Sequence, residues 1–205
     1  GMFTRVREMV SSILPGSAAY SRANCQTIGP AKTMPSTTKA PVITKPDDKF
    51  EIGKAIVRRP PGDVLFVTTG ICVGNALKAS DELARDGVKC GVIHFHTIKP
   101  FDSECLLQNI EGVRLLVTVE EHTLIGGLGS AVAEALADAG LARLPRIARI
   151  GIPDVFPNEY GSQESIMDSF GLSASKITET VRRNLMIASR NAAEFAAYTE
   201  THRGR

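Results

Sequence analysis

The chain has 205 residues, of which 43% are hydrophobic and 22% charged, and its 24 basic and 22 acidic side chains give a formal net charge of +2. This balance allows a sizeable buried core and indicates neither a nucleic-acid-binding nor a membrane-binding protein. The sequence contains no run of about 18 apolar residues, so it predicts no transmembrane helix. The cysteines match no zinc or CxxC spacing, which favours a reducing, cytoplasmic location; they are Cys25, Cys72, Cys90 and Cys105.

Two regions of the chain differ in character. Residues 1–47 begin with a candidate amphipathic helix over 2–14 and continue, over 15–46, with a Ser/Thr-rich stretch that prolines and glycines interrupt. This composition predicts an extended N-terminal segment. Apolar runs separated by turn residues follow, and we expect residues 48–205 to form one α/β domain with a long C-terminal helix.

The domain alternates short apolar runs with amphipathic stretches. The runs predict strands over residues 54–58, 64–68, 88–95, 115–119 and 146–150. Helices are expected over 70–87, from Asp102, over 130–139 and after Ser173, and the Asp and Ser side chains can act as N-caps. This order predicts a three-layer, Rossmann-like fold with a mostly parallel sheet. Ligands of such sheets bind at the carboxyl ends of the strands, which directs attention to residues 69–72, 94–100, 120–129 and 151–158.

The loop over residues 120–130 is the most distinctive of these. Gly127 and Gly129 stand just before Ser130, where backbone N–H groups could meet a phosphate at a helix start. The GxGxxG spacing of dinucleotide-binding turns is not present. We therefore favour tight chain packing around these glycines, with anion binding as the alternative.

Several polar side chains near strand ends are candidates for chemistry. Glu120, Glu121 and His122 could supply an acid, a base or metal ligands, although no second cluster in the sequence completes a metal site. His94 and His96 are two residues apart on a predicted strand, so they point to the same side. They could bind a metal, and hydrogen-bonded strand-end histidines are the ordinary alternative. Neither a GxSxG elbow nor a GxxxxGK[ST] loop occurs in the sequence.

An ordered series of short motifs resembles the C-terminal domain of transketolase-like proteins. It runs from about residue 50 to residue 185 and comprises residues 50–55, 62–64, 69–70, 96–102, 119–122, 126–134 and 149–156. The motifs at residues 97–100 and 121–122 resemble transketolase more than the E1 β chains or deoxyxylulose-phosphate synthases, which share the domain. Residues 29–31 and 41–43 resemble the last strand of the preceding pyrimidine-binding domain, although Lys32 and Met34 stand where that family has Tyr and Arg.

The resemblance implies an intact enzyme that uses thiamine diphosphate and Mg²⁺ to move a two-carbon ketol unit between sugar phosphates. In the family the cofactor is held by a Gly-Asp-Gly motif in an N-terminal domain and by a glutamate in the pyrimidine domain, and this sequence has no Gly-Asp-Gly. We therefore expect no catalytic, cofactor-binding or metal-binding residue in this chain.

The expected role is to support a homo- or hetero-oligomer, in a split enzyme with an N-terminal thiamine-binding section. The candidates for interface or loop contacts are Lys99, Glu120, Glu121, His122, Gly126, Gly127 and Gly129. One alternative is a free-standing anion- or nucleotide-binding module that uses Gly127, Gly129 and Ser130. Another is an orphan fragment without activity.

Overall fold

The computed structural model describes residues 43, 44, 46, 48–155 and 161–187. The helix predicted over 2–14, most of the segment over 15–46 and the end of the C-terminal helix lie outside these residues. The assignment of residues 1–47 to the end of a pyrimidine-binding domain therefore stays a prediction.

A five-stranded sheet forms the centre of the domain, in the order β1-β3-β2-β4-β5. Its strands are β1 (Ile56–Arg59), β2 (Val64–Thr68), β3 (Cys90–His94), β4 (Leu115–Thr123) and β5 (Arg146–Ile152). The pairs β2–β3, β2–β4 and β4–β5 are parallel, and the edge strand β1 runs antiparallel to β3. The predicted mostly parallel α/β sheet is confirmed.

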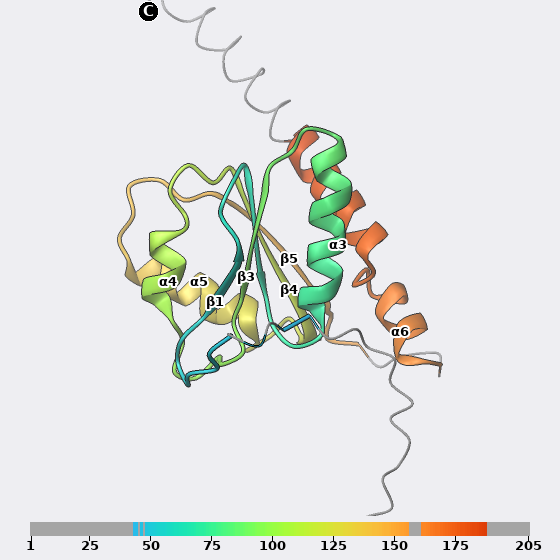
Figure 1. The fold of residues 1–205 in the computed structure, drawn as a ribbon, viewed down its shortest axis with the longest axis horizontal. Helices are drawn as coiled ribbons and strands as arrows, with labels where there is room; N and C mark the ends of the chain where they lie inside the picture. The colour runs from blue at the N-terminus through green and yellow to red at the C-terminus, as the bar shows by residue number, and fades with distance from the viewer. Residues whose placement is uncertain (1–42, 45, 47, 156–160, 188–205) are drawn as a thin grey trace, which may run out of the picture. The chain divides into compact units, whose positions relative to one another are not determined.

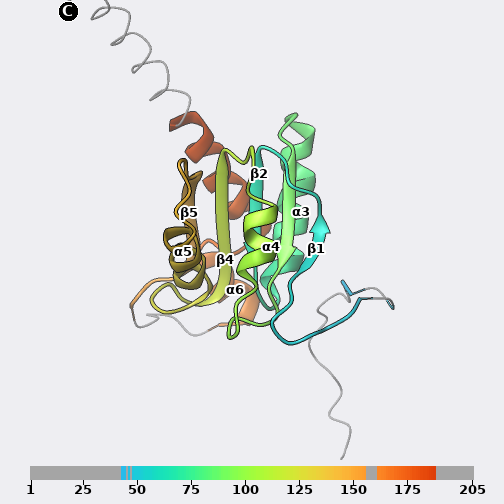
Figure 2. The same ribbon diagram turned by 90° about the vertical axis from the view of Figure 1, so that its left-hand side faces the viewer.

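Helices cover both faces of this sheet, which gives three layers. One face carries α3 (Cys72–Arg85), α6 (Gln163–Ser169) and the helix that begins at residue 174, and the other carries α4 (Ser103–Gln108) and α5 (Leu128–Asp138) (Figures 1 and 2). Side chains of β2 alternate between the two faces, so Val64 and Phe66 belong to one core and Leu65 and Val67 to the other. None of the described helices is long and apolar enough to cross a membrane.

The ends of the helices show which of the predicted N-caps form. Asp102 caps α4 as predicted, because its Oδ1 accepts the backbone N–H of Cys105 at 3.1 Å. Ser173 precedes the helix that begins at residue 174, but its hydroxyl donates to Oδ1 of Asp168 in α6 at 2.5 Å, so a bond to α6 takes the place of the proposed side-chain cap. The sequence did not predict the seven-residue helix α6, which Ser162 caps by accepting the N–H of Ser165 at 3.2 Å.

Strand β4 is longer than the sequence predicts. It was expected to end at Val119, but it continues to Thr123, which pairs with Ile152 of β5 after a shift in register. The physical reason is that β5 also extends, to Ile152, and supplies a partner that offsets the polar character of residues 120–122. Helix α5 likewise begins at Leu128 and not at Ser130.

Arg58 attaches the segment before β1 to the domain. Its guanidinium donates to the Asp48 carboxylate and to the carbonyl oxygen of Ile43. Both side chains of the Arg58–Asp48 ion pair are only 10% exposed. Ile43 itself packs against the core on the α3 side of the sheet. Contacts with the core therefore reach back at least to residue 43.

Candidate functional site

The carboxylate of Glu120 binds the start of helix α5. The residue is completely buried, and its Oε2 and Oε1 accept the backbone N–H groups of Leu128 at 2.6 Å and Gly129 at 2.9 Å. N–H groups in the first turn of a helix have no partner within the helix, and they lie at the positive end of the helix dipole. An acidic side chain from the neighbouring strand therefore takes the place that an anionic ligand could take.

The glycines of this turn are required by close contacts within the chain. A Cβ atom at Gly127 would collide with the Glu120 carboxylate and the carbonyl of Thr123. A Cβ atom at Gly129 would meet the Arg149 guanidinium and the hydroxyl of Thr118. This geometry supports the packing interpretation of the glycines.

Ser130 and Arg149 close the same turn. Ser130 Oγ accepts the N–H of Gly126 at 3.0 Å and lies 3.2 Å from Arg149 Nη2. Arg149 also donates to the carbonyl of Leu124. The turn is thus held to β5 as well as to β4.

An anion at this turn would have to displace Glu120. The Leu128 and Gly129 N–H groups that it would need already donate to a buried group of the same charge sign. The candidate anion site at Gly127, Gly129 and Ser130 gains no support from this geometry and stays a prediction.

The described residues also do not fit a thiamine diphosphate and magnesium site. Among residues 43–155 and 161–187, as far as they are described, no group of three or more His, Cys, Asp or Glu side chains could hold a metal ion. The start of α5, where a diphosphate could meet a helix dipole, is bound by Glu120. We assign no step of the family's chemistry to these residues.

The side chains of Glu121 and His122 do not lie together with that of Glu120 in one site. Glu121 is exposed on the α6 side, where its Oε1 accepts from Gln163 Nε2 at 3.0 Å. His122 is exposed, and its Nδ1 lies 3.1 Å from the carbonyl of Thr123. Lys99 is exposed in the segment between β3 and α4. The structure therefore spreads these candidates along one edge of the sheet.

His94 and His96 lie side by side at the end of β3. Their ring centroids are 6.1 Å apart, and Phe50 packs 5.0 Å from the His96 ring. Burial lowers the pKa of His94 below its usual value, and the His96 and Arg58 charges act in the same direction. Neither ring belongs to a group of three or more possible metal ligands within the described residues, so metal binding by this pair gains no support and stays a prediction.

Apolar side chains are exposed around the carboxyl edge, which is the edge where the parallel strands end. Because β1 is antiparallel, with Ile56 paired to His94, the segment before β1 lies at this edge too. The exposed apolar residues on segments next to it are Phe50, Ile52, Ile71, Ile125 and Val155. Leu141 and Leu144, which are also exposed, precede β5 and so lie at the opposite edge.

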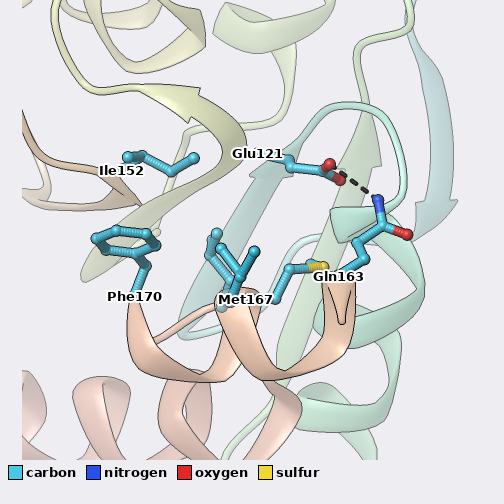
Figure 3. A pocket seen from close by; sticks show the side chains of 7 residues that line it. Glu121, Ile152, Gln163, Met167 and Phe170 are labelled. Carbon is cyan, nitrogen blue, oxygen red and sulfur yellow. Dashed lines mark hydrogen bonds between the residues drawn. The ribbon is translucent and has the colours of Figure 1, made fainter. Parts of the chain in front are cut away.

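A cavity of about 340 Å³ lies beside Glu121, and we call it the α6 cavity (Figure 3). The sequence did not reveal it, since its walls come from β4, β5, α6 and the turn after α6. The lining residues are Glu121, Ile152, Gln163, Ile166, Met167, Phe170 and Leu172.

The family model described as "Transketolase, C-terminal domain" matches residues 53–177. The chain belongs to the transketolase C-terminal domain family. The resemblance seen in the sequence is thereby confirmed, as is the fold that it implied.

Among its relatives is a 6-deoxy-6-sulfo-D-fructose transketolase subunit of Clostridium sp. (strain MSTE9), 41% identical over 135 residues that cover 66% of this chain and 41% of the relative. A protein of Methanocaldococcus jannaschii named as a transketolase C-terminal section is 36% identical over 136 residues, with the same two coverages of 66% and 41%. A 1-deoxy-D-xylulose-5-phosphate synthase of Synechococcus sp. (strain JA-2-3B'a(2-13)) is 42% identical over 135 residues, covering 66% of this chain and 20% of the synthase.

A solved structure described as "Split gene transketolase, inactive beta4 tetramer" is 33% identical, with a TM-score of 0.64. The similarity covers 72% of this chain and 47% of that chain. The match therefore spans less than half the length of these relatives, so the domain is shared and the activity of the whole proteins is a separate question.

Proposed function

We propose that this chain is the non-catalytic C-terminal section of a transketolase-like enzyme and that it supports subunit assembly. The assembled enzyme would transfer two-carbon ketol units between sugar phosphates, with thiamine diphosphate and Mg²⁺ bound outside this chain. The relatives that support this proposal include a transketolase subunit and a protein named as a C-terminal section, each matched over 41% of its length.

The observation that carries the proposal is the contact between Glu120 and helix α5. In open α/β sheets, ligands normally bind at the carboxyl edge. Here the buried Glu120 carboxylate already accepts the Leu128 and Gly129 N–H groups at that edge. Exposed apolar side chains such as Ile125 and Ile71 remain near it. An edge of this kind is suited to contact with another protein surface.

The partner in this proposal is an N-terminal thiamine-binding section, and the assembly is a homo- or hetero-oligomer such as a dimer. A cytoplasmic location fits the free thiols of Cys72, Cys90 and Cys105, since a reducing compartment keeps such thiols unpaired.

Calorimetric titration tests whether the cofactor binds outside this chain. The purified chain would be titrated with thiamine diphosphate and Mg²⁺, first alone and then mixed with a candidate N-terminal section encoded beside its gene. We expect no binding to the chain alone and saturable binding to the mixture. Binding to the isolated chain would contradict the proposal, and a mixture that neither binds cofactor nor forms a complex would favour an orphan fragment.

A pair of surface variants tests the assembly role. Ile125 is 68% exposed at the carboxyl edge, and Leu144 is 48% exposed at the opposite edge. We expect Ile125→Asp to weaken complex formation about tenfold or more, because it places a charge in an apolar contact, while the control Leu144→Asp leaves it unchanged. Light scattering after size-exclusion chromatography would measure this. Equal effects of the two variants would argue against an interface at the carboxyl edge.

A further inference from the structure

The α6 cavity has the size and the composition of a small-molecule site. Its volume of about 340 Å³ lies within the usual range for ligand pockets. Five of its lining residues are apolar, and they form walls on the β5 side and the α6 side: Ile152, Ile166, Met167, Phe170 and Leu172. Figure 3 shows the Phe170 and Met167 side chains rising from α6 and its end toward Ile152 and Glu121.

The polar groups of the cavity are gathered at one end. Glu121 Oε1 accepts from Gln163 Nε2 at 3.0 Å, drawn as the dashed line in Figure 3. This bond leaves the second carboxylate oxygen of Glu121 able to accept a hydrogen bond from a ligand. Among the described residues, the lining contains no Lys, Arg or His that could neutralise Glu121.

The thiol of Cys72 lies within the electrostatic reach of Glu121. Cys72, at the start of α3, is completely buried. Burial raises the pKa of its thiol to about 12, and the negative charges of Glu121 and Glu120 act in the same direction. Glu120 is bonded to two helix N–H groups, whereas Glu121 has the neutral carboxamide of Gln163 as its hydrogen-bond donor. The end of the cavity next to Glu121 therefore favours a positive charge.

We propose that the α6 cavity binds a small organic cation with an apolar body, of the arylalkylamine class. Its ammonium group donates to the Glu121 carboxylate, and its apolar part packs against Met167 and Phe170. Charge-assisted hydrogen bonds of this kind are the stronger ones, and the apolar walls supply the remaining affinity. The cavity lies at the carboxyl edge where assembly is also proposed, but probe binding is measured on the chain alone and assembly on the complex, so the failure of one proposal can be told from the failure of the other.

Three probes of similar shape and different charge test the proposal. The full chain would be titrated with benzylamine, benzyl alcohol and benzoate, and binding would be followed by NMR chemical-shift changes of residues around the cavity. We expect benzylamine to bind at least about tenfold more tightly than benzyl alcohol, which corresponds to one charge-assisted contact. Benzoate, which repels Glu121, is expected not to bind.

Two matched variants locate the effect. Glu121→Gln is expected to remove the preference for benzylamine and to leave the binding of benzyl alcohol unchanged. Glu164→Gln is the control, because Glu164 is an exposed carboxylate in the first turn of α6 that does not line the cavity. Ile166→Trp, which fills the cavity, should abolish the binding of every probe.

Three outcomes would overturn the proposal. One is equal affinity for the three probes, and another is a loss of preference that is as large in Glu164→Gln as in Glu121→Gln. The third is the absence of saturable binding of any probe to the isolated chain.

Discussion

Two adjacent acidic residues at the end of β4 lie on opposite faces of the sheet, and their carboxylates differ in burial and in hydrogen-bond partners. Glu120 points to the α5 side, where it is buried and accepts two helix N–H groups. Glu121 points to the α6 side, where it is exposed and borders an open cavity. The difference teaches that the face of the strand, and not the residue type, decides whether a carboxylate stabilises the fold or remains available to a ligand.

Removing each carboxylate in turn should give the largest difference between the two regions in the free energy of unfolding. Glu120→Ala would leave two buried N–H groups without an acceptor, so we expect it to lower the free energy of unfolding by about 3 kcal/mol. The matched variant Glu121→Ala removes an exposed side chain and should cost less than about 0.5 kcal/mol. Urea unfolding followed by circular dichroism would measure both. Similar costs for the two variants would contradict the comparison.

Substitution of Gly127, which lies beside the Glu120 carboxylate, should have the next largest effect on the free energy of unfolding. Gly127→Ala would push a methyl group into the Glu120 carboxylate and should cost about 2 kcal/mol, because neither group can move far in the packed turn. Gly140→Ala is the control: its φ of +59° disfavours a side chain, but no atom lies within 4 Å of the added Cβ. It should cost about 1 kcal/mol. The same urea measurements apply, and a larger loss at Gly140 would show that close contact is not what requires Gly127.

The raised pKa of the Cys72 thiol can be tested through the pH dependence of the free energy of unfolding. Burial, then Glu121 and then Glu120 raise the pKa of Cys72 from 9.0 to about 12 in the folded chain. Above pH 9 the thiol ionises in the unfolded chain but not in the folded one, so its contribution is complete below pH 9 and is lost as the pH rises toward 12.

We expect the stability advantage of the wild type over Cys72→Ala to shrink by about 1 kcal/mol per pH unit between pH 9 and pH 11. Val73→Ala, a non-titrating change at the adjacent buried residue, serves as the reference and should show a difference independent of pH. Urea unfolding at a series of pH values would measure it. Parallel curves for the wild type and Cys72→Ala would refute the expectation.

The smallest effect should lie at the mouth of the α6 cavity. Gln163→Leu removes the hydrogen bond to Glu121, but both residues are exposed and water can replace the lost partner. We expect a change in the free energy of unfolding of less than about 0.5 kcal/mol. Thermal unfolding monitored by calorimetry would detect a larger change, which would mean that the Glu121–Gln163 pair stabilises α6.

Much of the fold was accessible from the sequence because local signals agreed with the tertiary environment. The continuous apolar run at residues 64–68 predicted the buried strand β2 with the bounds that the structure has. Asp102 was identified as the cap of α4, and Gly87 takes the positive φ of +77° that ends the α3 region. These features depend on a few neighbouring residues, so a single sequence is enough to reveal them.

Other elements depended on partners far away in the chain. The polar residues after Val119 suggested that β4 ends there, whereas pairing of Thr123 with Ile152 extends the strand. Helix α6 is too short for a clear apolar period, although Ser162 as cap and Glu164 in the first turn are signals that could have indicated it.

The candidate site was located but its internal arrangement was not foreseen. The sequence singled out the glycines before Ser130, yet it could not show that the Glu120 carboxylate occupies the space next to Gly127. Which face each glutamate takes depends on the irregular register at the end of β4. The α6 cavity was equally hidden, because it forms only when α6 packs across the ends of β4 and β5.

The contact between Arg58 and the segment before β1 has a practical consequence for choosing boundaries of recombinant fragments. The family match begins at residue 53, which suggests an N-terminal cut close to that position. Such a cut would remove Asp48 and the Ile43 carbonyl, the two acceptors of a guanidinium whose side chain is only 10% exposed. It would also remove the packing of Ile43 against the core on the α3 side of the sheet. A shortened gene that retains residues from position 43 onward should therefore yield a more stable product than one that starts at the family boundary.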